Sequence, residues 1–368
     1  MMDLGTKRAS RLYGAATVVV GMILPLLLSG SWINGVASQL TEGYYSQSCP
    51  QVETIARQTL SSSLFLDITA PAALVRLAFH DCQVQGCDGS VLLATDSSRN
   101  IRSELMAGKS IGIRRLDFID RIKSAVEAEC PNTVSCSDIV VMAARDSVAL
   151  SGGPLMRVQL GRKDGNSASN NRADAALPAG SINVDGLMNV FSSMGLTLEE
   201  SVAIVGGGHS LGVGHCASFA NRLYPQVDPS LNPLMAGTLQ LLCPPVFSNS
   251  IAFSNNDLTN VIFDNQYFRD IQSGRGLLTL DNEISRDPRT VGIVRSFATN
   301  QGYFFQKFES GFRKMTQHQV LTGGAGEIRR NCRFVNSGPQ RQEQQQSHVM
   351  ASNVTGSGTS STVRKTNP

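Results

Sequence analysis

The eight cysteines of this 368-residue chain constrain its fold more than any other feature. Their number is even, and all of them follow the apolar stretch near the N-terminus. In an oxidising compartment such a set predicts four disulfides with no thiol left over. From the sequence alone, only the short loop between Cys82 and Cys87 favours a particular pair. A zinc site is the alternative, but the chain contains no Cys-x-x-Cys motif.

Residues 1–38 have the pattern of a secretory signal peptide. Lys7, Arg8 and Arg11 precede an apolar run at 15–28, and small residues at 36–38 offer a cleavage site. A membrane anchor is the alternative, but the run is shorter than the ~17–20 residues that a membrane span needs. We therefore expect export, cleavage, and no membrane attachment of the mature protein.

Residues 39–336 have the composition of one globular, mainly α-helical domain. The chain is 41% hydrophobic and 17% charged, and its net charge of +3 is too small to indicate nucleic-acid binding. A short strand is predicted at 157–160. Apolar periodicity predicts helices at 49–63, 71–82, 116–128, 137–149, 184–194, 197–205 and 291–315.

Residues 337–368 form a tail of a different kind. It is rich in Gln, Ser, Gly and Thr and has too few apolar residues to pack against the domain. Such a composition predicts disorder.

Arg76 and His80 are the first candidate functional pair. In a helix that begins near Pro71, they are four residues apart and therefore lie on one face. An imidazole can take a proton and return it to a departing oxygen, while a guanidinium stabilises developing negative charge. A buried histidine with an ordinary backbone acceptor is the alternative.

The residues after His80 place oxygen atoms at short intervals. Asp81, Asp88 and Ser90 lie in a loop that contains Gly86. Carboxylate, hydroxyl and carbonyl oxygens suit Ca²⁺, although the spacing is not that of an EF-hand. An ordinary polar loop is the alternative.

His209 is the second marked histidine. A capping box, Thr197 to Glu200, begins a helix that leads into three glycines at 206–208, and His209 follows them. Glycines would let a flat macrocycle approach the backbone beside the histidine. A haem enzyme needs one histidine on the iron and another on the opposite face. A glycine-rich helix end with an incidental histidine is the alternative.

Together these motifs resemble the secretory plant peroxidases, the class III haem peroxidases. The resemblance covers about 39–336. The distal motif runs from Arg76 through Phe79-His80-Asp81-Cys82 to Ser90, and the proximal motif is Val202-Ala-Ile-Val-Gly-Gly-Gly-His209-Ser210-Leu-Gly212. Further matching stretches begin at Cys130, Gly152, Leu160, Phe263, Leu321 and Ile328.

The resemblance implies a mainly α fold in which a distal and a proximal helical half enclose one haem b, with a short β-hairpin and four disulfides. It implies a secreted, monomeric enzyme that reduces hydrogen peroxide and oxidises small phenolic donors one electron at a time. The cell wall is expected rather than the vacuole. The alternative is a wall-binding structural protein that keeps the fold but has weakened catalysis.

The resemblance also assigns roles to individual residues. His80 is the expected acid–base group and Arg76 the transition-state stabiliser. His209 is the expected iron ligand, Asp281 its hydrogen-bond partner, Phe79 a haem contact and Pro178 a donor contact. The implied disulfides are Cys49–Cys130, Cys82–Cys87, Cys136–Cys332 and Cys216–Cys243. The first calcium ion would use Asp81, Val84, Gly86, Asp88 and Ser90, and the second Ser210, Asn256, Thr259, Ile262 and Asp264.

Two departures from the family pattern affect these sites. An aspartate is usual at the position of Asn256, and here Asp257 comes one residue later, which weakens the second calcium site. The asparagine that usually tunes the distal histidine is absent from the stretch Lys109-Ser110, although Glu104 of the same hydrogen-bond chain is present. We therefore expect His80 to be less well oriented.

Overall fold

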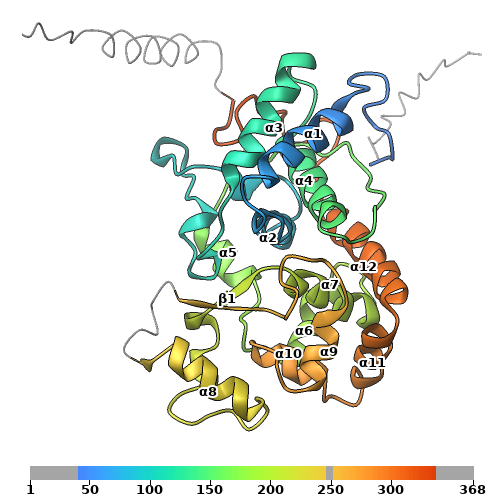
Figure 1. Cartoon of the computed structure of the whole chain (residues 1–368). Helices are drawn as coiled ribbons and strands as arrows, with labels where there is room; N and C mark the ends of the chain where they lie inside the picture. The colour runs from blue at the N-terminus through green and yellow to red at the C-terminus, as the bar shows by residue number, and fades with distance from the viewer. Residues whose placement is uncertain (1–39, 246–251, 337–368) are drawn as a thin grey trace, which may run out of the picture. The chain divides into compact units, whose positions relative to one another are not determined.

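Twelve α-helices and one small antiparallel sheet make up the part of the chain that the structure, a computed structural model, describes: residues 40–245 and 252–336 (Figure 1). The predicted mainly α fold is therefore confirmed. The expected signal peptide and C-terminal tail lie outside the described residues. Within these ranges, no helix has the length and apolar character that a membrane crossing requires.

The first group of helices surrounds α2. This helix packs on α4, while α1 packs on both α3 and α4. Pro71 lies in the first turn of α2, where a missing N–H costs nothing, and the Ser135 hydroxyl caps α4 by accepting from the Asp138 amide at 3.0 Å. The bounds are α1 Val52–Leu64, α2 Ala70–Gln83, α3 Leu116–Glu129 and α4 Cys136–Leu150.

The second group surrounds α7. Helix α12 packs along α7 and also contacts α2, so it joins the two groups. The core here is aromatic: the rings of Phe263 and Phe304 stack at 5.6 Å, and those of Phe263 and Phe308 meet at 4.8 Å. The bounds are α6 Val184–Ser192, α7 Leu198–Ser210, α9 Gln266–Gln272, α10 Thr279–Ile284, α11 Val291–Thr299 and α12 Gln301–Thr316. Helix α5, Asn170–Ala176, packs instead against the 3₁₀ helices at 104–106 and 108–110.

The sheet pairs β1, Val213–His215, with β2, Phe253–Asn255, directly after α7. Between its strands lies α8, Pro233–Leu242, which packs on a small core of its own around Phe219 and Leu239. Short 3₁₀ helices occupy the connections: Ser90–Leu92, Ser97–Arg99, Glu104–Met106, Gly108–Ser110, Cys216–Ser218 and Ala220–Arg222.

Three predicted elements differ from the structure. The single helix predicted at 291–315 is two helices, because Asn300 leaves helical geometry and its side chain caps α12 by accepting from the Tyr303 amide at 2.9 Å. The strand predicted at 157–160 is absent among the described residues, where Leu160 makes only an isolated bridge with Thr41. The helix predicted at 197–205 continues to Ser210.

All eight cysteines are paired in the structure. The longest connection, Cys136–Cys332, joins the first turn of α4 to the C-terminal segment across 196 residues of sequence. The pairs are those that the resemblance implies: Cys49–Cys130, Cys82–Cys87, Cys136–Cys332 and Cys216–Cys243.

A buried ion pair within the first group gives a test of stability. Asp138 and Arg162 are fully buried and meet at 2.8 Å, and the Tyr45 hydroxyl donates to the same carboxylate at 2.7 Å. Asp138→Ala leaves the buried guanidinium without a counter-charge, so we expect a loss of about 3–5 kcal/mol in the free energy of unfolding. Urea titration with the disulfides intact measures this loss.

Asp117→Ala is the matched control, because Asp117 forms an exposed pair with Arg121 at 3.4 Å. Its expected cost is below about 1 kcal/mol. Equal losses for the two variants would contradict the importance of the buried pair.

Candidate functional site

Helix α2 presents the first functional pair. His80 is buried, with 5% of its surface exposed, and the Phe79 ring lies edge-on to it at 6.0 Å. Burial, followed by the charge of Arg76, lowers the pKa of His80 to about 3. Nδ1 of His80 is buried and has no hydrogen-bond partner within the described ranges. The imidazole is therefore neutral near pH 7 and able to accept a proton.

The Arg76 guanidinium is held by the backbone of a neighbouring loop. It donates to the carbonyls of Ile111 at 3.1 Å and Lys109 at 3.2 Å. Gly112, at φ +88°, lies beside it: a Cβ there would come within 3.2 Å of the guanidinium and 3.5 Å of His215 Nε2. The loop therefore orients Arg76, and His215 of β1 lies close to the same point.

His209 lies in the last turn of α7. The predicted capping box is present, with the Thr197 amide donating to Glu200 at 2.7 Å and the Glu200 amide donating to the Thr197 hydroxyl at 3.2 Å. Nδ1 of His209 lies 2.8 Å from the Asp281 carboxylate. Because an ionised carboxylate only accepts, Nδ1 carries the proton and Nε2 is left as the basic nitrogen.

Asp281 is fixed by further donors. The Tyr267 hydroxyl donates to it at 2.9 Å and the Leu278 amide at 2.8 Å. Burial raises the pKa of Asp281, but His209 and these hydrogen bonds outweigh burial and hold it below its ordinary value. Asp281 therefore stays ionised and orients the imidazole. Tyr267 was not identified from the sequence, where its only signal is its place three residues after Asp264.

The three glycines before His209 do not share one role. A Cβ on Gly206 would lie 2.1 Å from the Phe268 ring, and one on Gly207 would lie 2.2 Å from Phe308. These two glycines therefore let the aromatic core approach α7. A Cβ on Gly208 would meet nothing within 4 Å, so there is open space at this glycine, which precedes His209 in the chain. Of the three glycines, only Gly208 therefore leaves room for the macrocycle that the sequence predicts.

The oxygen-rich loop after His80 brings carboxylates together. Asp81 accepts from the Gly89 amide at 2.9 Å, and Asp88 accepts from the Ser90 amide at 2.9 Å. Burial and the charge of Asp88 raise the pKa of Asp81 to about 8. Burial and the charges of Asp81 and Asp88 raise the pKa of Glu104 to about 8. Such crowding of acidic groups favours a cation at this loop.

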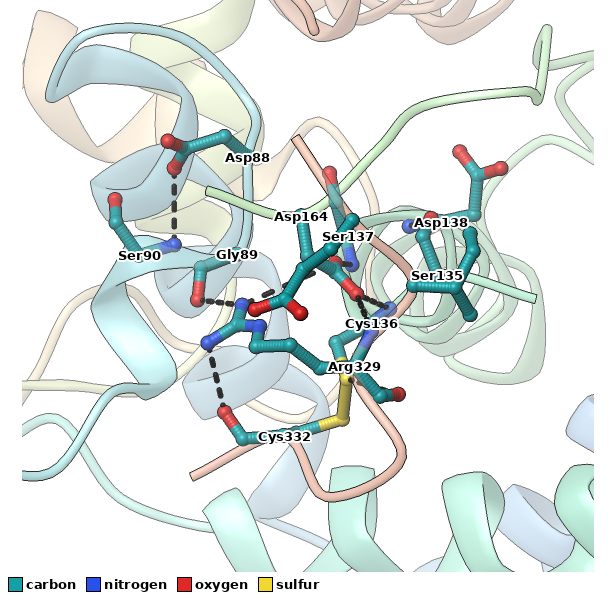
Figure 2. A network of polar contacts seen from close by, with 12 residues as sticks. Asp88, Gly89, Ser90, Ser135, Cys136, Ser137, Asp138, Asp164, Arg329 and Cys332 are labelled. Carbon is teal, nitrogen blue, oxygen red and sulfur yellow. Dashed lines mark hydrogen bonds and ion pairs between the residues drawn. A yellow bond between two sulfur atoms is a disulfide. The ribbon is translucent and has the colours of Figure 1, made fainter. Parts of the chain in front are cut away.

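A buried pair anchors this loop to the rest of the fold (Figure 2). Arg329 donates to the Gly89 carbonyl at 2.5 Å, and the Arg329 amide donates to Asp164 at 2.9 Å. Asp164 also accepts from the amides of Cys136 at 3.0 Å and Ser137 at 2.9 Å, at the start of α4. The loop is therefore fixed from the side that faces α4.

Four residues of the second predicted cation site lie together after α7. The Ser210 hydroxyl contacts the carbonyls of Ile262 at 3.3 Å and Asp264 at 3.0 Å. The Thr259 hydroxyl donates to the Asp264 carboxylate at 3.1 Å. The Asn256 amide instead donates to the Leu211 carbonyl at 2.9 Å.

Both predicted cation sites depend on mixed oxygen donors. Within residues 40–245 and 252–336, no three His, Cys, Asp or Glu side chains are placed to hold a metal ion by themselves. Hydroxyl and carbonyl oxygens must therefore complete any such site, which suits Ca²⁺ rather than a transition metal.

The segment next to Pro178 is tied to the loop that holds Arg76. Lys109 Nζ donates to the carbonyls of Asp174 and Leu177, each at 2.6 Å, and the Asp174 carboxylate accepts from the Lys109 amide at 3.0 Å. No sequence motif predicts this role of Lys109. It links the expected donor contact to the arginine loop.

The fold and the site together define a haem peroxidase: two helical groups, an Arg/His pair on α2, and a histidine on α7 whose Nδ1 is held by a carboxylate. A sequence model of the family described as Peroxidase matches residues 56–300. The chain therefore belongs to the peroxidase family, within the class III haem peroxidases of plants.

Named relatives agree with this assignment. Peroxidase 29 of Arabidopsis thaliana is 46% identical over 300 residues, covering 80% of this chain and 88% of that protein. Peroxidase 57 of the same plant is 42% identical over 304 residues, covering 81% of this chain and 93% of that protein. Peroxidase 21 is 37% identical over 302 residues, covering 81% and 91%.

The depressed pKa of His80 makes stability depend on pH. Its folded-state pKa of about 3 lies below the ordinary 6.5, so the folded protein binds fewer protons than the unfolded chain between these values. The contribution of His80 is complete above pH 6.5 and is lost as pH falls towards 3, by up to about 1.4 kcal/mol per pH unit. We expect His80→Gln to flatten this slope in urea unfolding from pH 7 to 4. Equal slopes for the two proteins would contradict the assignment.

Proposed function

We propose that this protein is a secreted, monomeric peroxidase that holds one haem b, reduces hydrogen peroxide to water and oxidises phenolic or other small aromatic donors. One observation carries the proposal. His209 is held through Nδ1 by an ionised Asp281, which leaves Nε2 as the ligand atom, and open space lies beside Gly208. His209 would therefore hold the iron, and Asp281 would raise its basicity.

The residues of α2 would serve the opposite face. His80, neutral near pH 7, would take a proton from the attacking peroxide oxygen and return it to the departing oxygen. Arg76 would stabilise the negative charge that develops there. When bound, the haem supplies the redox chemistry, in which two-electron reduction of peroxide to water is balanced by two one-electron oxidations of donor molecules. Phe79 would contact the haem and Pro178 the donors.

Two calcium ions complete the proposal. The first would bind the loop of Asp81, Val84, Gly86, Asp88 and Ser90. The second would bind Ser210, Thr259, Ile262 and Asp264. The raised pKa values of Asp81 and Glu104 support the first site, because a divalent cation would neutralise carboxylates that burial and mutual repulsion disfavour. The signal-like N-terminus and the four disulfides support export from the cell.

Reconstitution tests the proposed activity. The protein refolded with haem and calcium should show a Soret band of a histidine-ligated ferric haem and should oxidise guaiacol only when hydrogen peroxide is present. His209→Ala should lose the bound haem, whereas His80→Ala should keep it and lose peroxide-dependent turnover. A stable haem complex without turnover would favour the wall-binding structural alternative.

Ser110 gives a sharper test of the distal side. The Ser110 hydroxyl and His80 Nδ1 are both buried and have no partner within the described residues. The carbonyls of Lys109 and Ile111, on either side of Ser110, hold Arg76. The resemblance implies that an asparagine in this stretch would give Nδ1 an acceptor and orient the imidazole. We therefore expect Ser110→Asn to react about 10-fold faster with peroxide, part of the ~10²–10⁴ that a positioned acid–base group contributes.

Stopped-flow recording of the Soret band measures this rate. Ser193→Asn is the matched control, because Ser193 lies exposed at the end of α6, and its rate should equal that of the unchanged protein. An unchanged rate in Ser110→Asn would overturn the idea that His80 is poorly oriented.

A further inference from the structure

The segment that connects β2 to α9 contains two adjacent polar residues, Asn256 and Asp257, whose surroundings differ. Asn256 faces the strands: its amide donates to the Leu211 carbonyl at 2.9 Å, and a Cβ on Gly214 would lie 3.6 Å from Asn256 Oδ1. The backbone amide of Asn256 donates to the Gly212 carbonyl at 3.1 Å. Asn256 therefore binds this segment to the two residues that precede β1.

Asp257 is buried on the other side of the segment, with 5% of its surface exposed. One carboxylate oxygen, Oδ1, accepts from the Thr259 amide at 2.8 Å. The other, Oδ2, is buried and has no hydrogen-bond partner within the described residues. A buried, unpaired carboxylate oxygen is costly unless a positive charge or a donor meets it.

The groups around Asp257 are acidic. Thr259, whose amide meets Asp257, donates its hydroxyl to Asp264 at 3.1 Å, and the Leu258 amide donates to Asp270 at 3.0 Å. Asp264 belongs to the cluster of Ser210, Thr259 and Ile262 oxygens. The Asp257 carboxylate accepts from the Thr259 amide at 2.8 Å and therefore lies beside that cluster.

Asp270 is the other acidic neighbour, but its oxygens are already used. One accepts from the Leu258 amide at 3.0 Å and the other from the Gln266 side chain at 3.1 Å. Arg275 also approaches it at 3.8 Å. Asp270 therefore has partners that compensate its charge, whereas one carboxylate oxygen of Asp257 has no hydrogen-bond partner among the described residues.

We propose that Asp257, and not Asn256, supplies the carboxylate that completes the second calcium site with Ser210, Thr259, Ile262 and Asp264. The inference rests on the calcium part of the proposed function. Two carboxylates, Asp257 and Asp264, match the charge of a divalent cation, and hydroxyl and carbonyl oxygens supply the neutral ligands. The one-residue shift thus restores the carboxylate that Asn256 cannot provide.

Calcium content and affinity test the assignment. The haem-loaded, full-length protein is dialysed against low buffered calcium, the bound metal is counted by atomic emission, and calorimetry gives the affinity of each site. The unchanged protein should hold two calcium ions. Asp257→Asn should keep one and bind the second about 100-fold more weakly, because a ligand charge is lost. Asn256→Ala should keep both.

The results distinguish the assignment of Asp257 as a ligand from the proposal that the protein binds two calcium ions. Two tightly bound ions in Asp257→Asn, or loss of one ion in Asn256→Ala, would overturn the assignment of Asp257 and leave the calcium proposal standing. A lack of calcium in the unchanged protein would overturn both. Asn256→Ala keeps the test decisive even if Asp257→Asn does not fold, because retention of both ions excludes Asn256 as the essential ligand.

Discussion

The buried contact between Asp164 and Arg329 is the constraint on which the distal side depends. Both side chains are fully buried, and between them they hold the first turn of α4, the C-terminal segment and the carbonyl of Gly89. Burial raises the pKa of Asp164 even though Arg329 opposes it. Such a pair adds little net stability by itself, but removal of one partner leaves the other charge buried and uncompensated, which destabilises the fold. The pair therefore fixes where the loop after α2 lies.

The two histidines share one arrangement. His80 is followed by Asp81, and His209 by Ser210, so each functional imidazole is one residue from an oxygen of a proposed cation site. Asp81 is fixed by the Gly89 amide of the adjoining loop, and Ser210 is fixed by the carbonyl of Asp264, from a distant part of the chain. A cation at either place would hold the backbone beside its histidine. Under the proposed function, metal binding and histidine orientation would therefore be coupled through single peptide units.

Local signals in the sequence predicted much of this fold, because they involve neighbouring residues. The capping box at Thr197 and the shared face of Arg76 and His80 follow from helical geometry. The break at Asn300 was missed because apolar periodicity continues across it, and only the cap shows that the backbone turns. The packing roles of Gly206 and Gly207 depend on Phe268 and Phe308, which distant segments supply.

Long-range partners also explain why some site residues escaped sequence reasoning. Tyr267 contacts Asp281, and Lys109 contacts Leu177. His215 lies near Arg76. The spacing of residues in the sequence does not predict these contacts. Asn256 and Asp257 show the limit most clearly. A position in a motif predicts Asn256 as the ligand, yet the backbone turns its amide towards Leu211 and leaves the oxygen of Asp257 unpaired. A calcium site needs a carboxylate that points towards the other oxygen ligands. The backbone conformation determines which of the two adjacent residues has its side chain oriented in that way.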